Sequence, residues 1–344
     1  MRITIVTTMR NEGPHLLEWL AHHKAAGVTD FLIYSNECAD GTDTLLDVLD
    51  QAGLVTHIRQ KTGSKPPQWQ ALRAAWEHPV VTGSDWLACI DCDEFINLNN
   101  SFSGIPHLIE QSGADAIALQ WRLFGHNGHA DITDTPTTER FTAAAPPNLI
   151  YPALGNYFKT LFRRQGPFRQ FGVHRPRQKA PPRHAAPVWR DGAGRTMPQG
   201  FAQTDTRILI WPPRSVAGEV RLNHYSLRSA ADFMIKRDRG LPNHRKKPID
   251  LSYWVERNFN TCEDRSIAAM RPATEACLTD LRAISGVSEL QDAAVDWHRR
   301  RFEELLSDPE ELKLYGRILL ASGSTPPEDA LARELIERYR ANHA

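Results

Sequence analysis

The chain has 344 residues, enough for about two domains, and its 41 basic and 41 acidic side chains leave a formal net charge of zero. This balance argues against a dedicated nucleic-acid-binding protein and against a polybasic protein of the membrane surface. No run of about 18 apolar residues is present, and the apolar start at residues 3–8 is too short for a signal peptide. We therefore expect a cytoplasmic protein without a transmembrane segment.

The first hundred residues predict alternating strands and helices. Strands are expected at 3–8, 31–35, 54–59 and 86–90, and the helices between them at about 14–26, 43–52 and 64–76. This alternation is typical of an α/β fold with a mostly parallel sheet flanked by helices on both sides. Ligands of such sheets bind beyond the carboxyl ends of the strands, so the residues that follow each strand are the first candidates for a site.

The remaining chain is less regular and ends in a helical region. We expect strands at 116–123, 157–163, 207–211 and 219–226, loops at 133–147 and 178–199, a helix at 230–239, and mostly helices from residue 251 onward. The basic cluster at 236–239 is interpreted as a solvated helix end, with a role in binding a phosphate or an acidic glycan as the alternative.

The strongest chemical signal is Asp91-Cys92-Asp93, which follows the apolar strand at 86–90. Carboxylates two residues apart in an extended segment project to the same side, and two like charges so close are costly unless a cation bridges them. Carboxylate oxygens suit Mg²⁺ or Mn²⁺, which also take oxygens from substrate phosphates. Asp91 and Asp93 therefore predict a divalent metal site for a diphosphate ligand. Glu94 is either a third acid at the metal or the partner of an arginine or lysine.

Several segments together resemble a known family. These are Arg10-Asn11-Glu12 after the first strand, Ser35-Asn36 and Asp40-Gly41-Thr42 after the second, and Asp91-Cys92-Asp93-Glu94-Phe95 after the fourth. They are similar to the GT-A glycosyltransferases, and most of all to the bacterial family 2 branch whose D-x-D-E-F is shared with the family 92 galactosyltransferases. The resemblance covers about the first 125 residues. Later it rests on islands: Trp121 with Phe124-Gly125, and 223–226 before Lys236 and Arg239-Gly240.

The resemblance implies a GT-A (Rossmann-like) fold with a helical C-terminal extension. It implies a GT-A domain at 1–248, divided into a nucleotide-sugar half at about 1–125 and an acceptor half at about 126–248, followed by a helical region at 249–344. It also implies a nucleotide-sugar donor, usually a UDP-sugar, with Mn²⁺ or Mg²⁺ at Asp91 and Asp93. The expected donor-binding residues are Thr8, Arg10, Glu12, Asn36, Asp40, Lys65, Gln70 and Asp91.

Two aromatic positions have competing interpretations. His224 shares a strand face with apolar residues and by that pattern is a core histidine, whereas the resemblance implies a late histidine that closes the metal shell. His174 is a lower-ranked competitor for that role. Trp121 is a candidate for stacking on a sugar ring, although most tryptophans belong to cores.

The catalytic base is not located by any motif. An inverting transferase needs a carboxylate or histidine near the acceptor hydroxyl, and a retaining one does not. His129 and Asp131 follow the strand at 116–123, where an acceptor would enter, and are the predicted catalytic residues. As an alternative, they belong to an ordinary polar loop.

The leading hypothesis is a metal-dependent glycosyltransferase that moves a sugar, typically a hexose, to a glycan or lipid-linked acceptor. Expected partners exclude nucleic acid and are compatible with peripheral membrane contact, and no oligomeric state is predicted. The alternative is a non-catalytic glycan- or nucleotide-binding protein on the same scaffold. A phosphatase of the D-x-D-x-[TV] type would need its aspartates after the first strand, and a nucleotidyltransferase would need a Gly-rich basic loop there, so neither fits.

Overall fold

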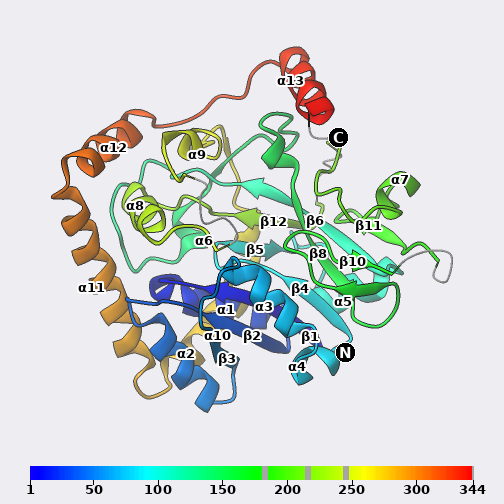
Figure 1. Cartoon of the computed structure of the whole chain (residues 1–344), viewed down its shortest axis with the longest axis horizontal. Coiled ribbons are helices and arrows are strands. Elements are labelled where there is room, and N and C mark those ends of the chain that lie inside the picture. Colours follow the sequence, from blue (N-terminus) through cyan, green and yellow to red (C-terminus); the bar gives the residue numbers. More distant parts are fainter. Residues whose placement is uncertain (180–184, 214–217, 243–247, 343–344) are drawn as a thin grey trace.

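The computed structural model describes residues 1–179, 185–213, 218–242 and 248–342. Its centre is a nine-stranded sheet of order β3-β2-β1-β4-β8-β6-β12-β5, with β11 paired to β6 (Figure 1). The first four strands in this order are parallel, whereas β8 and β5 run antiparallel to their neighbours. The expected α/β fold with a mostly parallel sheet is confirmed.

The strands of this sheet are β1 (Ile3–Met9), β2 (Asp30–Ser35), β3 (Thr56–Arg59), β4 (Trp86–Cys89), β5 (Glu94–Asn97), β6 (Ala116–Leu123), β8 (Phe158–Arg163), β11 (Trp189–Asp191) and β12 (Arg221–His224). Short pairs form between β7 (Ala143–Ala144) and β13 (Cys262–Glu263), and between β9 (Phe168–Gln170) and β10 (Arg177–Gln178). The helices up to residue 239 are α1 (Gly13–Ala25), α2 (Thr42–Gln51), α3 (Pro67–Ala75), α4 (Pro79–Thr82), α5 (Ile105–Ser112), α6 (Thr137–Arg140), α7 (Gln199–Ala202) and α8 (Ala230–Arg239).

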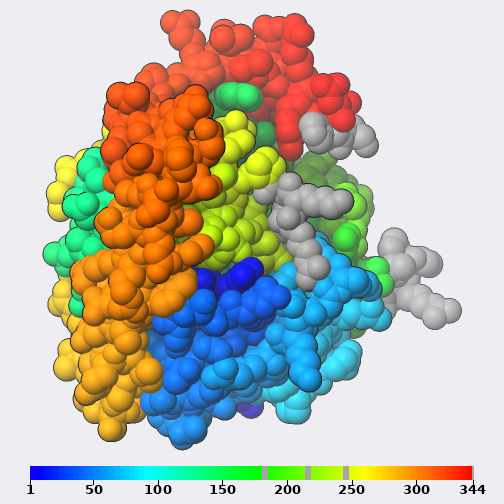
Figure 2. Space-filling view, turned by 60° about the vertical axis from the view of Figure 1, so that its left-hand side comes forward, coloured from blue at the N-terminus to red at the C-terminus, as the bar shows by residue number. Residues whose placement is uncertain are grey.

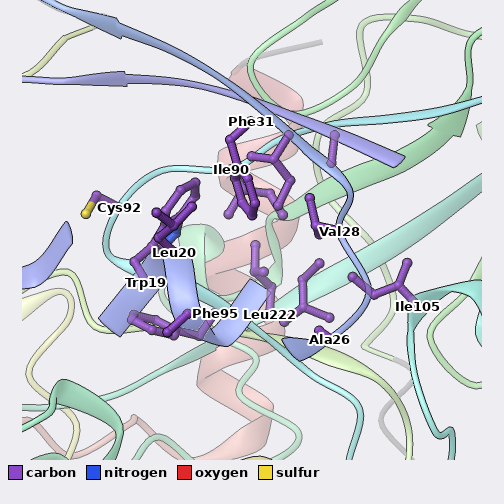
Figure 3. Close-up of a cluster of buried hydrophobic side chains, with 14 of the residues drawn as sticks. Trp19, Leu20, Ala26, Val28, Phe31, Ile90, Cys92, Phe95, Ile105 and Leu222 are labelled. Atoms are coloured by element: carbon purple, nitrogen blue, oxygen red, sulfur yellow. The ribbon is translucent and has the colours of Figure 1, made fainter. Parts of the chain in front are cut away.

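The alternating side chains of the central strands feed two separate cores, one on each face of the sheet. In β1, Ile5 joins the cluster that α1, α2, α5 and α10 cover, whereas Val6 joins the cluster under α3 and α4. Figure 3 shows the first cluster, in which Trp19 of α1 lies with Phe95 and Leu222. β4 is buried along its whole length, as the continuous apolar run predicts.

Several elements begin where local chemistry favours them. Pro14 occupies the first turn of α1, where a missing N–H costs nothing. At α8 the Ser229 side chain accepts from the Asp232 N–H while Asp232 bonds back to Ser229, which forms a capping box. These starts matter because both helices border the carboxyl end of β1 and β4.

Three expectations about elements differ from the structure, and one strand was not predicted at all. The strand predicted at 207–211 is only a single bridge between Tyr157 and Leu209, and Pro212 and Pro213 follow it directly. The segment Glu94–Asn97, for which no element was predicted, is β5. The loop expected at 133–147 contains α6, and the one expected at 178–199 contains β11, with 180–184 outside the described residues.

The region after residue 250 is helical, as expected, and wraps around the N-terminal part. Its elements are α9 (Leu251–Val255), the 3-10 turn η2 (Ser266–Met270), α10 (Arg271–Arg282), α11 (Val287–Leu306), α12 (Pro309–Leu320) and α13 (Asp329–Asn342). α10 packs on α1, and α11 contacts α1, α2 and α8. Figure 2 shows α11 and α12 (orange) running beside both the N-terminal segments (blue) and the segments around α8 and α9 (yellow-green). No helix in the described ranges is long and apolar enough to cross a bilayer.

Candidate active site

Two adjoining cavities, of about 160 and 530 Å³, open at the edge of the sheet where β1, β2, β3 and β4 have their carboxyl ends. They share Thr8 and the segment from Arg239 to Pro242, which follows α8. The smaller cavity contains the acidic motif and is called here the acidic pocket. The larger one lies beyond β2 and β3 and is called the outer pocket.

Asp93 is a buried carboxylate of the acidic pocket. Lys236 of α8 donates to Asp93 Oδ2 at 2.7 Å and to the Ser226 carbonyl at 2.8 Å. The Nε2 atom of His224 lies 3.7 Å from Asp93 Oδ1. Burial alone would raise the pKa of Asp93, but Lys236 and His224 outweigh it and hold the pKa well below its usual value. Asp93 is therefore ionised at neutral pH.

Asp91 and Glu94 share a different cation, Lys159 of β8. Lys159 is 1 % exposed, and its Nζ lies 2.9 Å from Asp91 Oδ2 and 3.3 Å from Glu94 Oε2. Gln68 donates to the other oxygen of Asp91 at 2.8 Å. Glu94 also accepts from the Trp121 indole at 2.7 Å and from the Asp91 amide at 2.8 Å. Of the two alternatives for Glu94, the structure thus shows the pairing with a lysine.

Glu12 forms a third buried ion pair at the same edge. Arg228 donates to Glu12 Oε2 at 2.9 Å and to the Cys92 carbonyl at 3.0 Å, and Arg239 pairs with Glu12 Oε1. Burial raises the pKa of Glu12, yet Arg239 and Arg228 together lower it below its usual value. Since Arg239 reaches both cavities, it is a cation that a ligand spanning them would meet.

One wall of the acidic pocket is aromatic. The ring of Trp121 lies against His224 (centroids 4.2 Å apart), His174 (5.3 Å) and Tyr157 (5.6 Å). Burial lowers the pKa of His224, so its imidazole is neutral at pH 7, and none of the described residues pairs with its buried Nδ1. His174 is neutral as well, because burial lowers its pKa to about 3, and its Nδ1 bonds the Phe158 carbonyl.

The outer pocket contains the expected nucleoside residues. Thr8, Arg10 and Asn36 line it, together with Thr62 and Gly63 from the loop after β3. The Thr8 hydroxyl and the Asn36 side-chain oxygen are buried and bond to none of the described residues. Buried polar atoms normally have a hydrogen-bond partner, because leaving them without one costs free energy. These two oxygens are therefore candidates for hydrogen bonds with a ligand.

The structure places five of the predicted site residues elsewhere. Asp40 is committed to the scaffold, since its carboxylate accepts from the Gly13 amide, from Thr42 and from His298. Lys65 is exposed, and the Gln70 side chain donates to the Lys65 carbonyl. Neither residue lines the acidic pocket or the outer pocket.

His129 and Asp131 also lie outside both pockets. The His129 ring bonds the Arg140 carbonyl at 3.0 Å and packs on Phe141, and Asp131 is exposed. Their environment is that of the ordinary polar loop given as the alternative.

Sequence reasoning missed most of the basic side chains of the site. Those that line the acidic pocket or pair with its acids are Lys159, Arg228, Lys236, Arg239 and Arg257, and the neutral amide of Gln68 was missed as well. The interpretation of 236–239 as a solvated helix end is wrong, because Lys236 is buried on Asp93. A lysine between the apolar residues of the strand Phe158–Arg163 was the one signal for Lys159.

The residues present fit a divalent cation in part. No group of three histidine, cysteine or acidic side chains in the described ranges is arranged to hold a metal. Asp93 and neutral His224 lie beside each other in the pocket and are of the right chemistry, whereas both oxygens of Asp91 already bond Gln68 and Lys159. Mg²⁺ usually takes only one or two protein ligands and completes its shell with substrate phosphates and water. An ion at Asp93 and His224 is compatible with this pattern.

Comparison with known proteins identifies the family. The family model described as glycosyltransferase family 92 matches residues 7–188. A family 92 protein of Ricinus communis is 30% identical over 128 residues, which are 36% of this chain and 22% of the relative. One of Oryza sativa subsp. japonica is 27% identical over 168 residues, 44% of this chain and 28% of the relative. The chain thus spans less than a third of the length of these curated relatives.

Among solved structures, the 1–349 fragment of S. aureus TarS is 13% identical with a TM-score of 0.35, and 89% of this chain and 91% of that chain are covered. The same fragment in complex with UDP-GlcNAc gives 12% identity and a TM-score of 0.34. Because the family model covers more than half of the sequence, including the end of β1, the whole of β4 and the acidic motif, the chain belongs to glycosyltransferase family 92.

Proposed function

We propose that this protein is a glycosyltransferase that binds a nucleotide-sugar across the outer and acidic pockets and transfers the sugar to a glycan or lipid-linked acceptor. The observation that carries the proposal is the convergence of ionised Asp93, Lys236 and Arg239 in a pocket at the carboxyl ends of β1 and β4. Family membership supports the same activity. By the resemblance seen in the sequence, the donor is a UDP-sugar.

The charges of the two pockets suit a nucleoside diphosphate. The outer pocket offers to a base or ribose the side-chain oxygens of Thr8 and Asn36, which bond to no residue in the described part of the chain. Lys236, Arg239 and Arg257 line the acidic pocket, where the diphosphate would lie between the nucleoside and the sugar. Lys236 and Arg239 also pair with Asp93 and Glu12, but in a largely buried site these cations attract the two negative charges of the diphosphate more strongly than they would in water.

We further propose that Mn²⁺ or Mg²⁺ binds at Asp93 and His224. When bound, the ion supplies Lewis-acid stabilisation of the charge on the departing diphosphate. Asp91 is not a ligand of the ion in this arrangement. Its bonds to Gln68 and Lys159 hold its carboxylate in the wall of the pocket. Trp121, held by Glu94, presents its ring on the side where the sugar would lie.

The proposed transfer exchanges one bond for another. The acceptor hydroxyl oxygen bonds the anomeric carbon of the sugar while the bond between that carbon and the diphosphate oxygen breaks. The nucleoside diphosphate leaves with the electron pair, and the hydroxyl proton is released. Lys236 and Arg239 stabilise the leaving group because they lie where its negative charge grows.

The test is a thermal-shift panel with UDP, GDP, CDP and ADP, each with and without Mn²⁺. A ligand that binds only the folded state raises the melting temperature. We expect one nucleotide, UDP by the resemblance, to give a metal-dependent rise that Asp93→Asn abolishes. Asp296→Asn, at an exposed position of α11, is the matched control and should keep the full rise.

Two results would contradict the proposal. If none of the four nucleotides shifted the melting temperature, a non-catalytic glycan-binding protein would be favoured instead. A metal-dependent shift that Asp93→Asn leaves unchanged would show that Asp93 is not a ligand of the ion. In both cases circular dichroism must first show that the variant is folded, because Asp93→Asn leaves Lys236 buried without its charge partner.

A further inference from the structure

A cavity of about 550 Å³ lies on the far side of Tyr157 from the acidic pocket, and nothing above assigns it a role. Its lining includes Tyr157, Thr204, Arg207, Trp211, Tyr339 and Arg340. The volume is typical of a ligand pocket rather than of a packing defect. It is called here the α13 cavity, because the last helix forms one of its walls.

Tyr157 belongs to both the α13 cavity and the acidic pocket. Its ring lies against Trp121 and His174 on the acidic side. Its hydroxyl, on the other side, lies 3.3 Å from the hydroxyl of Tyr339. A ligand in the α13 cavity would therefore be separated from the proposed position of the donor sugar by the side chain of Tyr157 alone.

The helix α13 is held in place by contacts remote in sequence. An extended connection carries the chain from α12 to α13 (Figure 1). In α13, Ala332 and Ile336 lie one turn apart and are buried against Ile150 and Ala153. Trp211 donates from its indole to Glu337 Oε1 at 3.0 Å. The C-terminal turn of α13 thereby presents its side chains to the cavity.

The chemistry of the lining matches that of a saccharide. Tyr157, Trp211 and Tyr339 supply flat apolar faces with a polar edge, which suit the C–H faces of sugar rings. Arg207, Arg340 and the threonine hydroxyls supply hydrogen bonds for sugar hydroxyls. A few polar groups among aromatic walls are the usual composition of a specific ligand site.

We propose that the α13 cavity binds the acceptor as a saccharide chain, whose terminal hydroxyl reaches the acidic pocket past Tyr157. The proposal rests on the proposed glycosyl transfer and gives its acceptor a chemical class and a place. It also gives α13 a function, since this helix contributes Tyr339 and Arg340 to the site.

Saturation-transfer NMR of the full chain measures the binding of free tetrasaccharides of glucose, of galactose and of N-acetylglucosamine. Nucleotide binding is measured in parallel on the same protein. The variants are Tyr339→Ala and Arg340→Ala. Arg338→Ala is the matched control, because it lies on the same helix, is 73% exposed and pairs with Glu334 outside the cavity. Replacing one residue that anchors a ligand typically weakens binding by about tenfold.

We expect at least one tetrasaccharide to bind the unmodified chain and to bind both cavity variants about tenfold more weakly, while nucleotide binding and the Arg338→Ala variant stay unchanged. A protein that binds nucleotide but no tetrasaccharide would overturn the proposal. So would saccharide binding that both cavity variants retain. Saccharide binding without nucleotide binding would support the cavity and contradict the proposed function instead.

Discussion

The two aspartates of the acidic motif each bond a lysine from a distant part of the chain, Lys159 for Asp91 and Lys236 for Asp93. A carboxylate pair at the end of a buried strand needs compensating charge, and the protein itself supplies one cation for each. A divalent ion at Asp93 would share this carboxylate with Lys236. The bond between Lys236 and Asp93 is thus the contact most directly coupled to ligand binding.

Replacing Lys236 by methionine tests this contact. Lys236→Met should lower the free energy of unfolding by about 3 kcal/mol, because it leaves a buried carboxylate without its charge partner. Mn²⁺ should restore part of the loss if it binds at Asp93. Urea unfolding with and without Mn²⁺ gives both quantities. Arg237→Met is the control: its ion pair with Glu311 is partly exposed, and the cost should stay below about 1 kcal/mol. Equal losses in the two variants would contradict the expectation.

At the residue level, the sequence located the acids of the site better than its bases. Asp91, Asp93 and Glu12 follow strands directly, and the rule for parallel sheets brings such residues to one edge. Lys159 and Lys236 arrive from β8 and α8, by contacts that only tertiary packing creates. Asp40 shows the converse, because a residue after β2 meets the same rule but bonds the N-terminal turns of α1 and α2.

Among the elements, α1 has an unusual buried side of histidines. His22 bonds the Ile96 carbonyl of β5 at 2.8 Å, and the ring of the adjacent His23 packs on Phe95. Burial lowers the pKa of His22 to about 4, against an ordinary value of 6.5. The packing of α1 on β5 therefore requires a neutral imidazole.

This requirement predicts acid sensitivity. Between pH 6.5 and about 4 the unfolded chain binds a proton at His22 that the folded chain does not, so stability is full above pH 6.5 and falls as the pH drops. From pH 7 to pH 5 the loss from this group should be about 2 kcal/mol. Urea unfolding at both pH values should show a loss smaller by that amount in His22→Asn. His107→Asn, on partly exposed α5, should leave the pH dependence as it is. An identical slope in His22→Asn and in the unmodified chain would contradict the argument.

Long, periodic elements could be predicted from sequence, and short ones that depend on partners could not. The strand at 116–123 and the helix at 230–239 have the predicted bounds, since each has a clear apolar pattern. β5 has four residues and exists because it pairs with β12. The apolar run at 207–211 has the composition of a strand but gains only one bridge.

For the whole molecule, the question is whether the C-terminal helices form a unit of their own. A boundary at 248/249 is predicted from the extent of the resemblance and from the change to a helical pattern after residue 250. In the structure Leu278 and Leu281 of α10 and Val287 of α11 belong to the same core cluster as Ile3 and Trp19. One shared core favours cooperative unfolding of both regions.

Leu281→Ala tests this at a position that is 2% exposed. Emptying a buried leucine site costs about 3 kcal/mol, and because the core is shared the loss should appear equally in helical circular dichroism and in tryptophan fluorescence. Leu320→Ala on α12 is the control, as its side chain is 86% exposed and its removal should cost less than about 0.5 kcal/mol. Two separate transitions, with the helical signal lost first, would show instead that residues 249–344 unfold independently of the sheet. In that case α13 would leave its cavity before the donor pocket is lost, and saccharide binding would fail at a lower temperature than nucleotide binding.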